Sequence, residues 1–352
     1  MKPSRATGLA ALAAATLLAT TGCVVDQPGS GGSPGAASGS ITVACGATEA
    51  VCSAWTKAFT QKTGVQASFV RLSSGETVAR LAAAKSAPEF DVWHGGPADG
   101  YGAAAKQELL EKYVSPTASE IPDKYKDPNG YWTGVYVGAL GFCSNKKVLA
   151  EKGVGVPDSW DSLLVPQLKG QVSTAHPSTS GTAFTTLWTQ VTRLGSEDAG
   201  LGYMKQLHQN VLQYTKSGTA PGQVAGRGEV AVGLVFSHDC VLYKEQGMSD
   251  LVVSFPKEGT GYEVGGVAVV KGAKNTAAAQ KYVDWAITAE AQEVGPTAGA
   301  YQVHTNPKAK TDERMVKLED VKLVDYDFDQ ASAAKKALTT RFDAEVAAQP
   351  KS

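Results

Sequence analysis

The sequence predicts an α/β protein of two lobes, with a hinge and a ligand cleft between them. Three observations support this fold class. Strand and helix patterns alternate with short loops, which is typical of sheets covered by helices. About 310 residues follow Ser40, more than one ordinary core needs, and they suit two lobes of about 150 residues each. Two long apolar stretches that contain glycine, 132–143 and 263–270, are expected to cross between the lobes.

The first lobe is expected to form a mostly parallel sheet covered on both faces by helices. Gly64 ends the first helix, because glycine favours the left-handed conformation found at helix ends. The next helix begins after Ser73, and Glu76 three residues later completes a capping box. Strands are predicted at 41–44, 65–72 and 90–93, and helices at 51–62, after Ser73 and through about 109–113.

The second lobe continues the α/β pattern between the two crossings, without an internal repeat of fixed period. Strands are predicted at 172–175, 211–214, 230–236 and 251–255, with helix signals at 159–160, 182–194 and 196–209. Helices at 276–288, 289–297 and 330–347 follow the return crossing. These assignments predict lobe 1 at 41–137, lobe 2 at 138–262, a return to lobe 1 at 263–315 and a C-terminal helical segment at 316–352.

The chain begins with features of an export signal. Two basic residues precede an apolar run at 9–19 that is too short to span a bilayer. This start resembles a bacterial lipoprotein signal, cut before Cys23 so that the cysteine carries lipid, although Thr20 stands where leucine is usual. An ordinary secretory signal is the alternative. We predict a signal peptide at 1–22, a flexible tether at 23–40 and a membrane-anchored, extracytoplasmic protein of the cell envelope.

Charge and hydropathy exclude several classes of partner. The formal net charge is -1 and no cluster of lysine and arginine stands out, so nucleic acid and anionic lipid are poor partners. No second apolar run approaches about 20 residues, so no membrane-spanning helix is expected. The histidines share no metal-ligand spacing, and we expect neither a metal nor a cofactor.

Four cysteines besides Cys23 indicate disulfides, since an even number in an oxidising compartment favours pairing. Cys45 ends a strand and Cys52 lies in the following helix, close enough for a local bridge. Cys143 and Cys240 then form a long-range pair. Of the three pairings that four cysteines allow, we favour this one.

Two loops rich in hydroxyl groups each lie between a strand and a helix start. Free backbone N–H groups at a helix start favour an anion such as phosphate. Ser73 fits plain capping, which makes Ser74 the better ligand candidate. In the loop 176–182, four hydroxyls and a glycine exceed what capping needs. We therefore predict an oxyanion held across a cleft, with these candidate ligands: Ser74, Gly75, Thr179, Ser180, Gly181 and Thr182.

A further polar group follows the strand at 230–236. His238 and Asp239 can exchange hydrogen bonds there with the hydroxyls of a polyol, while a helix cap and a structural histidine are the alternatives. Glu263 opens the return crossing, where a buried carboxylate needs a ligand hydroxyl or ammonium as partner, unless it lies in a surface turn. Three side chains with rings either line the cleft or pack in the core: Trp93, His94 and Tyr136.

Six motifs accompany the lipoprotein start: Cys-Gly-Ala-x-Glu, Phe-Asp-Val-Trp-x-Gly-Gly, Thr-Ser-Gly-Thr, Gly-Glu-Val-Ala-Val-Gly, Glu-Gly-Thr-Gly-Tyr-Glu and Tyr-Gln-Val-His-Thr-Asn-Pro. Over about 41–347 they resemble the solute-binding proteins of bacterial ABC importers, in the branch labelled as ferric-iron type. The resemblance implies a periplasmic-binding-protein type II fold. Its two α/β lobes close over one ligand and deliver it to a membrane permease.

The residues after the strand 230–236 bear on the ligand class. Iron-binding members of the family carry adjacent tyrosines there, whereas this chain has Ser237, His238 and Asp239, with Tyr243 alone further on. Phenolates are the hard oxygen donors that Fe(III) prefers. The resemblance therefore gives no strong case for Fe(III).

The pattern is instead similar to the hexose-phosphate-binding relatives. This similarity implies that His238, Asp239 and Glu263 hold the sugar, and that Ser74 with 179–182 holds the phosphate. Aminoalkylphosphonate-binding relatives share the hydroxyl loops, and for such a ligand Glu263 or Asp239 would pair with the ammonium group.

The prediction is a lipid-anchored solute-binding protein that captures a small anionic solute, with a sugar phosphate favoured over an aminoalkylphosphonate or Fe(III). We expect a monomer without catalytic residues that meets an ABC permease in the membrane. One rival is an extracellular phosphatase with His238 as acid and Ser74 or Ser180 as nucleophile, but the sequence lacks a nucleophile elbow and a carboxylate-rich metal cluster. A structural lipoprotein without a small ligand is another.

Overall fold

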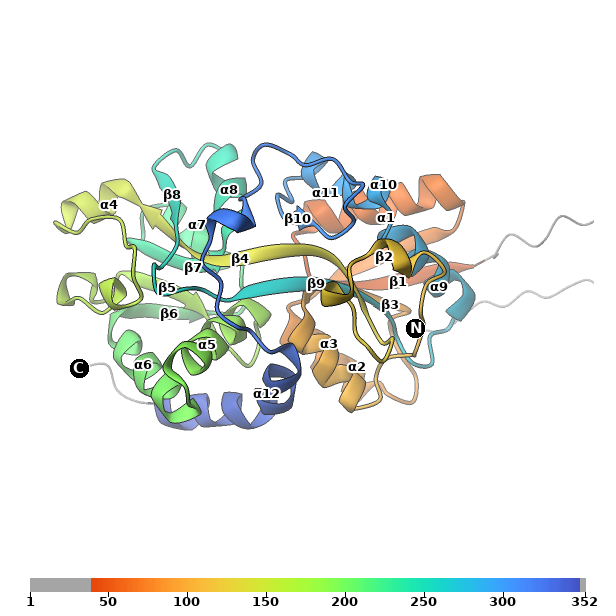
Figure 1. The fold of residues 1–352 in the computed structure, drawn as a ribbon, viewed down its shortest axis with the longest axis horizontal. Helices are drawn as coiled ribbons and strands as arrows, with labels where there is room; N and C mark the ends of the chain where they lie inside the picture. Colours follow the sequence, from red (N-terminus) through yellow and green to blue (C-terminus); the bar gives the residue numbers. More distant parts are fainter. Residues whose placement is uncertain (1–38, 349–352) are drawn as a thin grey trace, which may run out of the picture. The chain divides into compact units, whose positions relative to one another are not determined.

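The structure is a computed structural model that describes residues 39–348, which form a mixed α/β fold around one large sheet (Figure 1). The strand order is β2-β1-β3-β9-β4-β7-β5-β6, and β8 and β10 each pair with β4. The strands are β1 (Ser40–Cys45), β2 (Gln66–Arg71), β3 (Val92–Pro97), β4 (Thr133–Asn145), β5 (Val172–Ala175), β6 (Val211–Thr215), β7 (Val232–Phe236), β8 (Leu251–Ser254), β9 (Tyr262–Val269) and β10 (Val303–His304).

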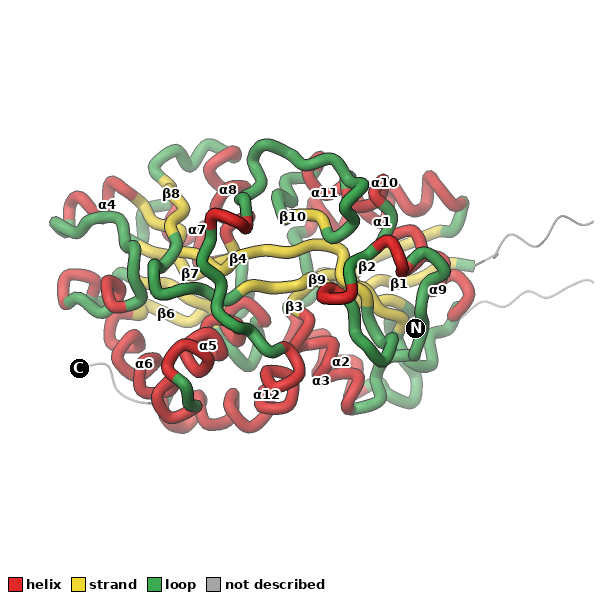
Figure 2. Tube along the Cα trace, viewed as in Figure 1, coloured by secondary structure: helices red, strands yellow, loops and turns green. Residues whose placement is uncertain are grey.

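Helices lie on either side of the strands (Figure 2). They are α1 (Glu49–Thr63), α2 (Ser74–Ala83), α3 (Ala98–Lys106), α4 (Lys146–Glu151), α5 (Gly181–Leu194), α6 (Glu197–Asn210), α7 (Ala220–Gly226), α8 (Ser237–Glu245), α9 (Thr276–Ala286), α10 (Ala289–Gln292), α11 (Val294–Thr297) and α12 (Phe328–Phe342). A π-helical turn at Asp343–Ala347 continues α12. The predicted capping box of Ser73 and Glu76 is present at the start of α2.

The two ends of the sheet are parallel, and its middle is antiparallel. β1 pairs in parallel with β2 and β3, and β5 pairs in parallel with β6 and β7. Between them, β4 runs antiparallel to β9 with residues 133–139 and antiparallel to β7 and β8 with residues 140–145. The mostly parallel sheet expected for the first lobe matches β1, β2 and β3, whereas the crossing strands, for which no pairing direction was predicted, are antiparallel. The two long crossings run in opposite directions and hydrogen-bond to each other there (Figure 1).

Buried apolar side chains form separate clusters in the two parts of the sheet. One cluster packs β1 against α1 and α9 and includes Val43, Phe59 and Tyr282. Another packs β5 and β7 against α5 and α6 and includes Trp160 and Phe342. By its contacts the described part of the chain is one compact unit. The lobe boundaries expected at 137, 262 and 315 remain predictions.

Most predicted elements are present within a few residues, with several differences. The helix expected through about 109–113 ends at Lys106, and Leu110 instead forms a bridge with Val270 at the sheet. Leu109 and Leu110 are both buried, so their apolar character reflects core packing rather than a longer helix. The short helices α4, α7 and α8 and the two-residue strand β10 were not predicted.

The predicted disulfides are both present. Cys45, at the end of β1, pairs with Cys52 in α1, and their Cα atoms are 6.0 Å apart. Cys143, in β4, pairs with Cys240 in α8 at a Cα distance of 5.4 Å. The favoured pairing is confirmed.

The predicted signal peptide at 1–22, the lipidated Cys23 and nearly all of the tether at 23–40 lie outside the described residues. Within 39–348, no helix is long and apolar enough to cross a membrane.

Candidate functional site

A cavity, partly open to solvent, lies where several strands end. Open α/β sheets bind their ligands at the carboxyl ends of strands, where loops turn into helices. Here residues at or just after the ends of β1, β2, β3, β5, β6 and β7 meet side chains from the crossing strands β4 and β9. The lining is Gly46, Ala47, Thr48, Arg71, Ser73, Ser74, Gly96, Pro97, Tyr136, Ser180, Gly181, Thr182, Gly218, Thr219, Phe236, His238, Asp239 and Glu263.

Two helix starts meet at one end of the cavity. Ser74 is the first residue of α2, and Gly181 is the first residue of α5. A Cβ atom at Gly181 would lie 3.0 Å from Ser74 Oγ and closer still to the ring of Pro97, so only glycine permits this approach. The first N–H groups of each helix have no partner within the helix, and the helix dipoles add positive potential. This end of the cavity therefore suits an anion.

Arg71, at the end of β2, lines the same cavity and was not predicted from the sequence. Its Nε donates to the Ala47 carbonyl oxygen at 3.2 Å, and one terminal nitrogen donates to Ser217 Oγ at 2.8 Å. Among residues 39–348, no carboxylate forms an ion pair with it, and it is the only lysine or arginine in the lining. The guanidinium thus adds a full positive charge to the cavity.

At another part of the lining, His238, Asp239 and Glu263 lie together. His238 Nε2 is 3.7 Å from Glu263 Oε1 and 3.9 Å from Asp239 Oδ1, and all three side chains are buried. Gly138 in β4 leaves room for them, because a Cβ atom there would lie 2.8 Å from His238 Nδ1.

Two of the alternatives that the sequence left open, a helix cap at Asp239 and a surface turn at Glu263, are not what the structure has. The start of α8 has no side-chain cap, so Asp239 does not cap it. Glu263 is buried within β9 and is not part of a surface turn. His238 stacks on Phe236, and its other side faces the cavity.

Burial shifts the pKa of each group in this cluster. It raises the pKa of Asp239 to about 7, although the charge of Arg71 acts in the opposite direction. It also raises the pKa of Glu263, and the nearby Asp239 raises it further. Burial lowers the pKa of His238 to about 3, so the imidazole is neutral. Neutral imidazole and carboxyl groups can both donate and accept hydrogen bonds, which suits hydroxyl groups.

The ring-bearing candidates separate into two groups. Tyr136 lines the cavity, and its hydroxyl accepts a hydrogen bond from the Gly96 N–H at 2.9 Å. Trp93 is fully buried in the core, where it stacks on Tyr101 with ring centroids 3.9 Å apart. His94 stacks on Trp55 at 3.9 Å and is not in the lining of this cavity.

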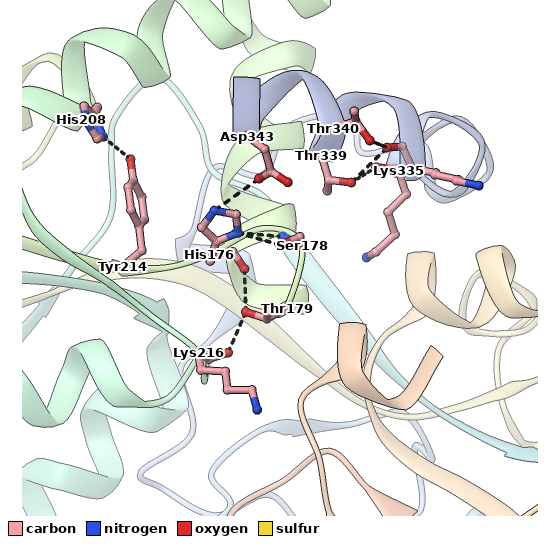
Figure 3. Close-up of polar contacts among 11 residues, drawn as sticks. His176, Ser178, Thr179, His208, Tyr214, Lys216, Lys335, Thr339, Thr340 and Asp343 are labelled. Carbon is pink, nitrogen blue, oxygen red and sulfur yellow. Dashed lines mark hydrogen bonds and ion pairs between the residues drawn. The ribbon is translucent and has the colours of Figure 1, made fainter. Parts of the chain in front are cut away.

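Two of the hydroxyl-loop candidates also lie outside the lining. The Gly75 N–H donates to the Thr179 carbonyl oxygen at 3.0 Å, so these residues contact each other. Thr179 Oγ1 lies 3.0 Å from the Lys216 carbonyl oxygen (Figure 3). His176, at the start of the same loop, lies between Ser178 Oγ at 2.7 Å and Asp343 at 3.3 Å, and so joins the loop to the chain after α12 (Figure 3).

No group of three or more His, Cys, Asp or Glu side chains is arranged to hold a metal ion in the described part of the chain. Tyr243, the lone tyrosine after β7, is buried in the core, and its hydroxyl donates to the Thr219 carbonyl oxygen at 3.0 Å. Its phenol oxygen is thus already engaged by a backbone carbonyl group, and Tyr243 is not among the residues that line the cavity.

Comparison with known proteins decides the family. Residues 54–321 match the family of bacterial extracellular solute-binding proteins. The chain belongs to this family. It is a solute-binding protein of the ABC-importer type with an extracytoplasmic location, and members of the family bind solutes rather than convert them. The predicted fold class is confirmed.

Individual relatives bind different solutes. The periplasmic binding protein AfuA from Actinobacillus pleuropneumoniae, solved with exogenous fructose-6-phosphate bound, superposes with a TM-score of 0.86 at 40% identity, covering 89% of this chain and 100% of AfuA. A Salmonella typhimurium protein assigned to 2-aminoethylphosphonate binding is 29% identical over 50% of this chain and 49% of its own. Iron-bound HitA from Pseudomonas aeruginosa shares the fold at 19% identity and a TM-score of 0.74, covering 86% of this chain and 98% of HitA.

Proposed function

We propose that the protein captures a small phosphorylated solute, with a sugar phosphate favoured, and delivers it to an ABC permease. Lipid on Cys23 would anchor the protein to the membrane, as the lipoprotein-like start of the sequence implies. In this account the ligand-binding residues are Arg71, Ser74, Ser180, Gly181, Thr182, His238, Asp239 and Glu263, with Tyr136 beside them.

The observation that carries the proposal is that one cavity has two chemically different sets of groups. Arg71 supplies positive charge, and the starts of α2 and α5 supply helix-dipole potential and the N–H groups of their first residues, Ser74 and Gly181, which suit a phosphate. His238, Asp239 and Glu263 supply donors and acceptors in a buried cluster, which suit several hydroxyl groups. A sugar phosphate satisfies both sets with one molecule.

An aminoalkylphosphonate is the second candidate. Its phosphonate would occupy the same positively charged end, and its ammonium group would need an ionised carboxylate at Asp239 or Glu263. Burial raises the pKa of both carboxyls, which disfavours the charged form before the ligand arrives. The similarity to the sugar-phosphate-bound AfuA also extends over far more of the chain than the similarity to the Salmonella protein.

Iron binding and phosphatase activity have less support. The similarity to HitA is too distant to carry more than the fold, and Tyr243 does not reach the lining. For a phosphatase, a base would have to contact the nucleophile. In the described residues, Ser180 Oγ instead accepts from the Ala183 N–H, and no histidine hydrogen-bonds to Ser74 or Ser180.

A thermal-shift panel tests the proposal. The signal-less protein is heated with hexose 6-phosphates, 2-aminoethylphosphonate, inorganic phosphate or ferric citrate, each at several concentrations. A ligand at one hundred times its Kd stabilises the protein by about 2.7 kcal/mol, so a specific ligand gives a clear rise in Tm. We expect the largest shift with a hexose phosphate. A shift with 2-aminoethylphosphonate alone, or with ferric citrate alone, would overturn the sugar-phosphate assignment.

A further inference from the structure

Beside the cavity, the β2–α2 segment contacts two loops from the other end of the sheet. We call the contact of residues 71–76 with residues 178–179 and 216–217 the seam. The Gly75 N–H donates to the Thr179 carbonyl oxygen at 3.0 Å, and Arg71 donates to Ser217 Oγ at 2.8 Å. An ion pair joins Glu76 to Lys216. Since these segments belong to the β1–β2 and β5–β6 ends of the sheet, the seam joins its two parallel ends directly.

The approach at the seam is close enough to require glycine at position 75. A Cβ atom on Gly75 would lie 2.2 Å from the Ser178 carbonyl oxygen and 2.8 Å from that of Thr179. Both are backbone atoms, which cannot relieve a steric clash by changing rotamer as a side chain can. Gly75 does not have a positive φ, so its backbone conformation alone would accept alanine. The requirement therefore comes from the contact across the seam.

Glu76 links the seam to the helix start. Its Oε2 accepts the Ser73 N–H at 3.2 Å as part of the capping box, while its Oε1 pairs with Lys216. Burial raises the pKa of the Glu76 carboxyl, but the hydrogen bonds from Lys216 and Ser73 lower it by more, so that it stays ionised. The Lys216 carbonyl oxygen in turn accepts from Thr179 Oγ1 at 3.0 Å.

Gly75, Glu76, Thr179 and Lys216 do not line the cavity. They cannot contact a ligand held there. Their interactions therefore affect ligand binding by shifting the equilibrium between a form in which the two sides of the cavity are together and one in which they are apart. A ligand that bridges the two sides binds more tightly when a larger fraction of the protein is already closed.

We infer that the seam is a built-in latch, in which Gly75, Glu76 and Lys216 are positioning residues that raise ligand affinity by favouring the closed form. This inference rests on the proposed function for its affinity readout. The seam itself can be observed without any ligand.

Hydrogen exchange at the Gly75 amide observes the latch directly. Gly75 is the second residue of α2, so its N–H has no partner within the helix, and its protection depends on the Thr179 carbonyl oxygen. In the ligand-free protein, we expect this amide to exchange slowly by NMR. Rapid exchange of the Gly75 amide in the wild-type protein would overturn the inference.

The variants Lys216→Met and Gly75→Ala weaken the latch in different ways. Because exposed ion pairs contribute little, we expect Lys216→Met to raise the Kd for fructose 6-phosphate by about two- to fivefold and to speed exchange at the Gly75 amide. Gly75→Ala favours the helical conformation of α2 but prevents the close contact at the seam. We expect it to raise the Kd for fructose 6-phosphate by at least about tenfold. The control Lys205→Met removes a surface pair with Glu345 that lies away from the cavity.

The two readouts separate failure of the latch from failure of the ligand assignment. If fructose 6-phosphate does not bind the wild-type protein while the Gly75 amide is protected and Lys216→Met exposes it, the latch stands and the ligand class is wrong. If Gly75→Ala and Lys216→Met bind fructose 6-phosphate as tightly as Lys205→Met does, the latch does not set affinity and the inference fails.

Discussion

Arg71 gives the cavity its charge. The guanidinium has no ion-pair partner within the described residues, and it faces the same space as the starts of α2 and α5. The side chain is only partly buried, and a bound dianion would pair with its charge and accept its hydrogen bonds. The residue therefore distinguishes a phosphorylated solute from a neutral sugar.

We predict that Arg71→Met weakens binding of a hexose 6-phosphate by about 10- to 100-fold, because a hydrogen bond to a charged group contributes about 1.5–3 kcal/mol. Titration calorimetry measures the change. The matched control is Arg227→Met, since Arg227 pairs with Glu229 on the surface and lies outside the lining. Equal affinities for the two variants would exclude Arg71 from the site.

Asp239 should make the ligand-free protein sensitive to pH. Burial raises its pKa from 3.8 to about 7, so between these values the folded state binds more protons than the unfolded state. The contribution of this group to stability is therefore fully present below about pH 4 and is lost as the pH rises to about 7.

We predict that Asp239→Asn removes the loss of folding stability that Asp239 causes as the pH rises from about 4 to about 7. Melting curves of the ligand-free variant and wild type should diverge as the pH rises from 4 to 7, with the variant gaining up to about 1.4 kcal/mol for each pH unit. The same variant should bind the sugar end of the ligand less well. Parallel stability profiles would show that Asp239 is not held in an unfavourable charged state.

The sequence indicated several site residues but could not settle their roles. His238 and Asp239 were candidates because they follow a strand end, and Glu263 because it opens the return crossing. The cavity brings all three together. Arg71 was missed because it is the last residue of β2, and the sequence does not say towards which element its long side chain turns. Trp93, in contrast, was a candidate for lining the cleft but is buried in the core.

At the scale of elements, the disulfide of Cys143 with Cys240 ties the crossing strand β4 to α8, the helix whose first turn carries His238 and Asp239. It closes a loop with a sequence separation of 97 residues, whereas Cys45 and Cys52 are separated by only 7. A longer loop loses more entropy on closure in the unfolded chain, so the long-range disulfide should contribute more.

We predict that Cys143→Ala with Cys240→Ala lowers the free energy of unfolding by about 4.7 kcal/mol, against about 2.4 kcal/mol for Cys45→Ala with Cys52→Ala, on the loop-entropy relation. Urea unfolding of both double variants measures the difference. A larger loss for the short-loop variant would show that local packing, not loop closure, determines these contributions.

The loops before α2 and α5 were predictable because hydroxyl groups and glycine gather there in excess of what capping needs. The sequence did not show which residues of these loops line the cavity and which contact the other loop. Ser74, Ser180 and Thr182 line the cavity, while Gly75 and Thr179 contact each other across the seam. Which residues of a loop face a ligand depends on the direction of the chain in space, and a loop without periodicity does not reveal that direction.

At the scale of the whole molecule, alternation of strands and helices was enough to predict an α/β fold, and the long glycine-containing stretches marked the crossings. The sequence did not reveal that the crossing strands β4 and β9 pair antiparallel with each other, or that β4 also pairs antiparallel with β7 and β8. Pairing between strands far apart in the chain is decided by tertiary packing rather than by local pattern. The same limit applies to the seam, whose partners are more than 100 residues apart.

In the proposed function, one cavity binds both ends of a phosphorylated sugar. Titration calorimetry of the signal-less protein with fructose 6-phosphate, with fructose and with inorganic phosphate tests it most directly. Because the two sets of groups act on one molecule, we predict that the ester binds at least about 100-fold more tightly than either half alone. If fructose 6-phosphate binds no more tightly than inorganic phosphate, His238, Asp239 and Glu263 do not hold a sugar. That result would contradict the proposed function.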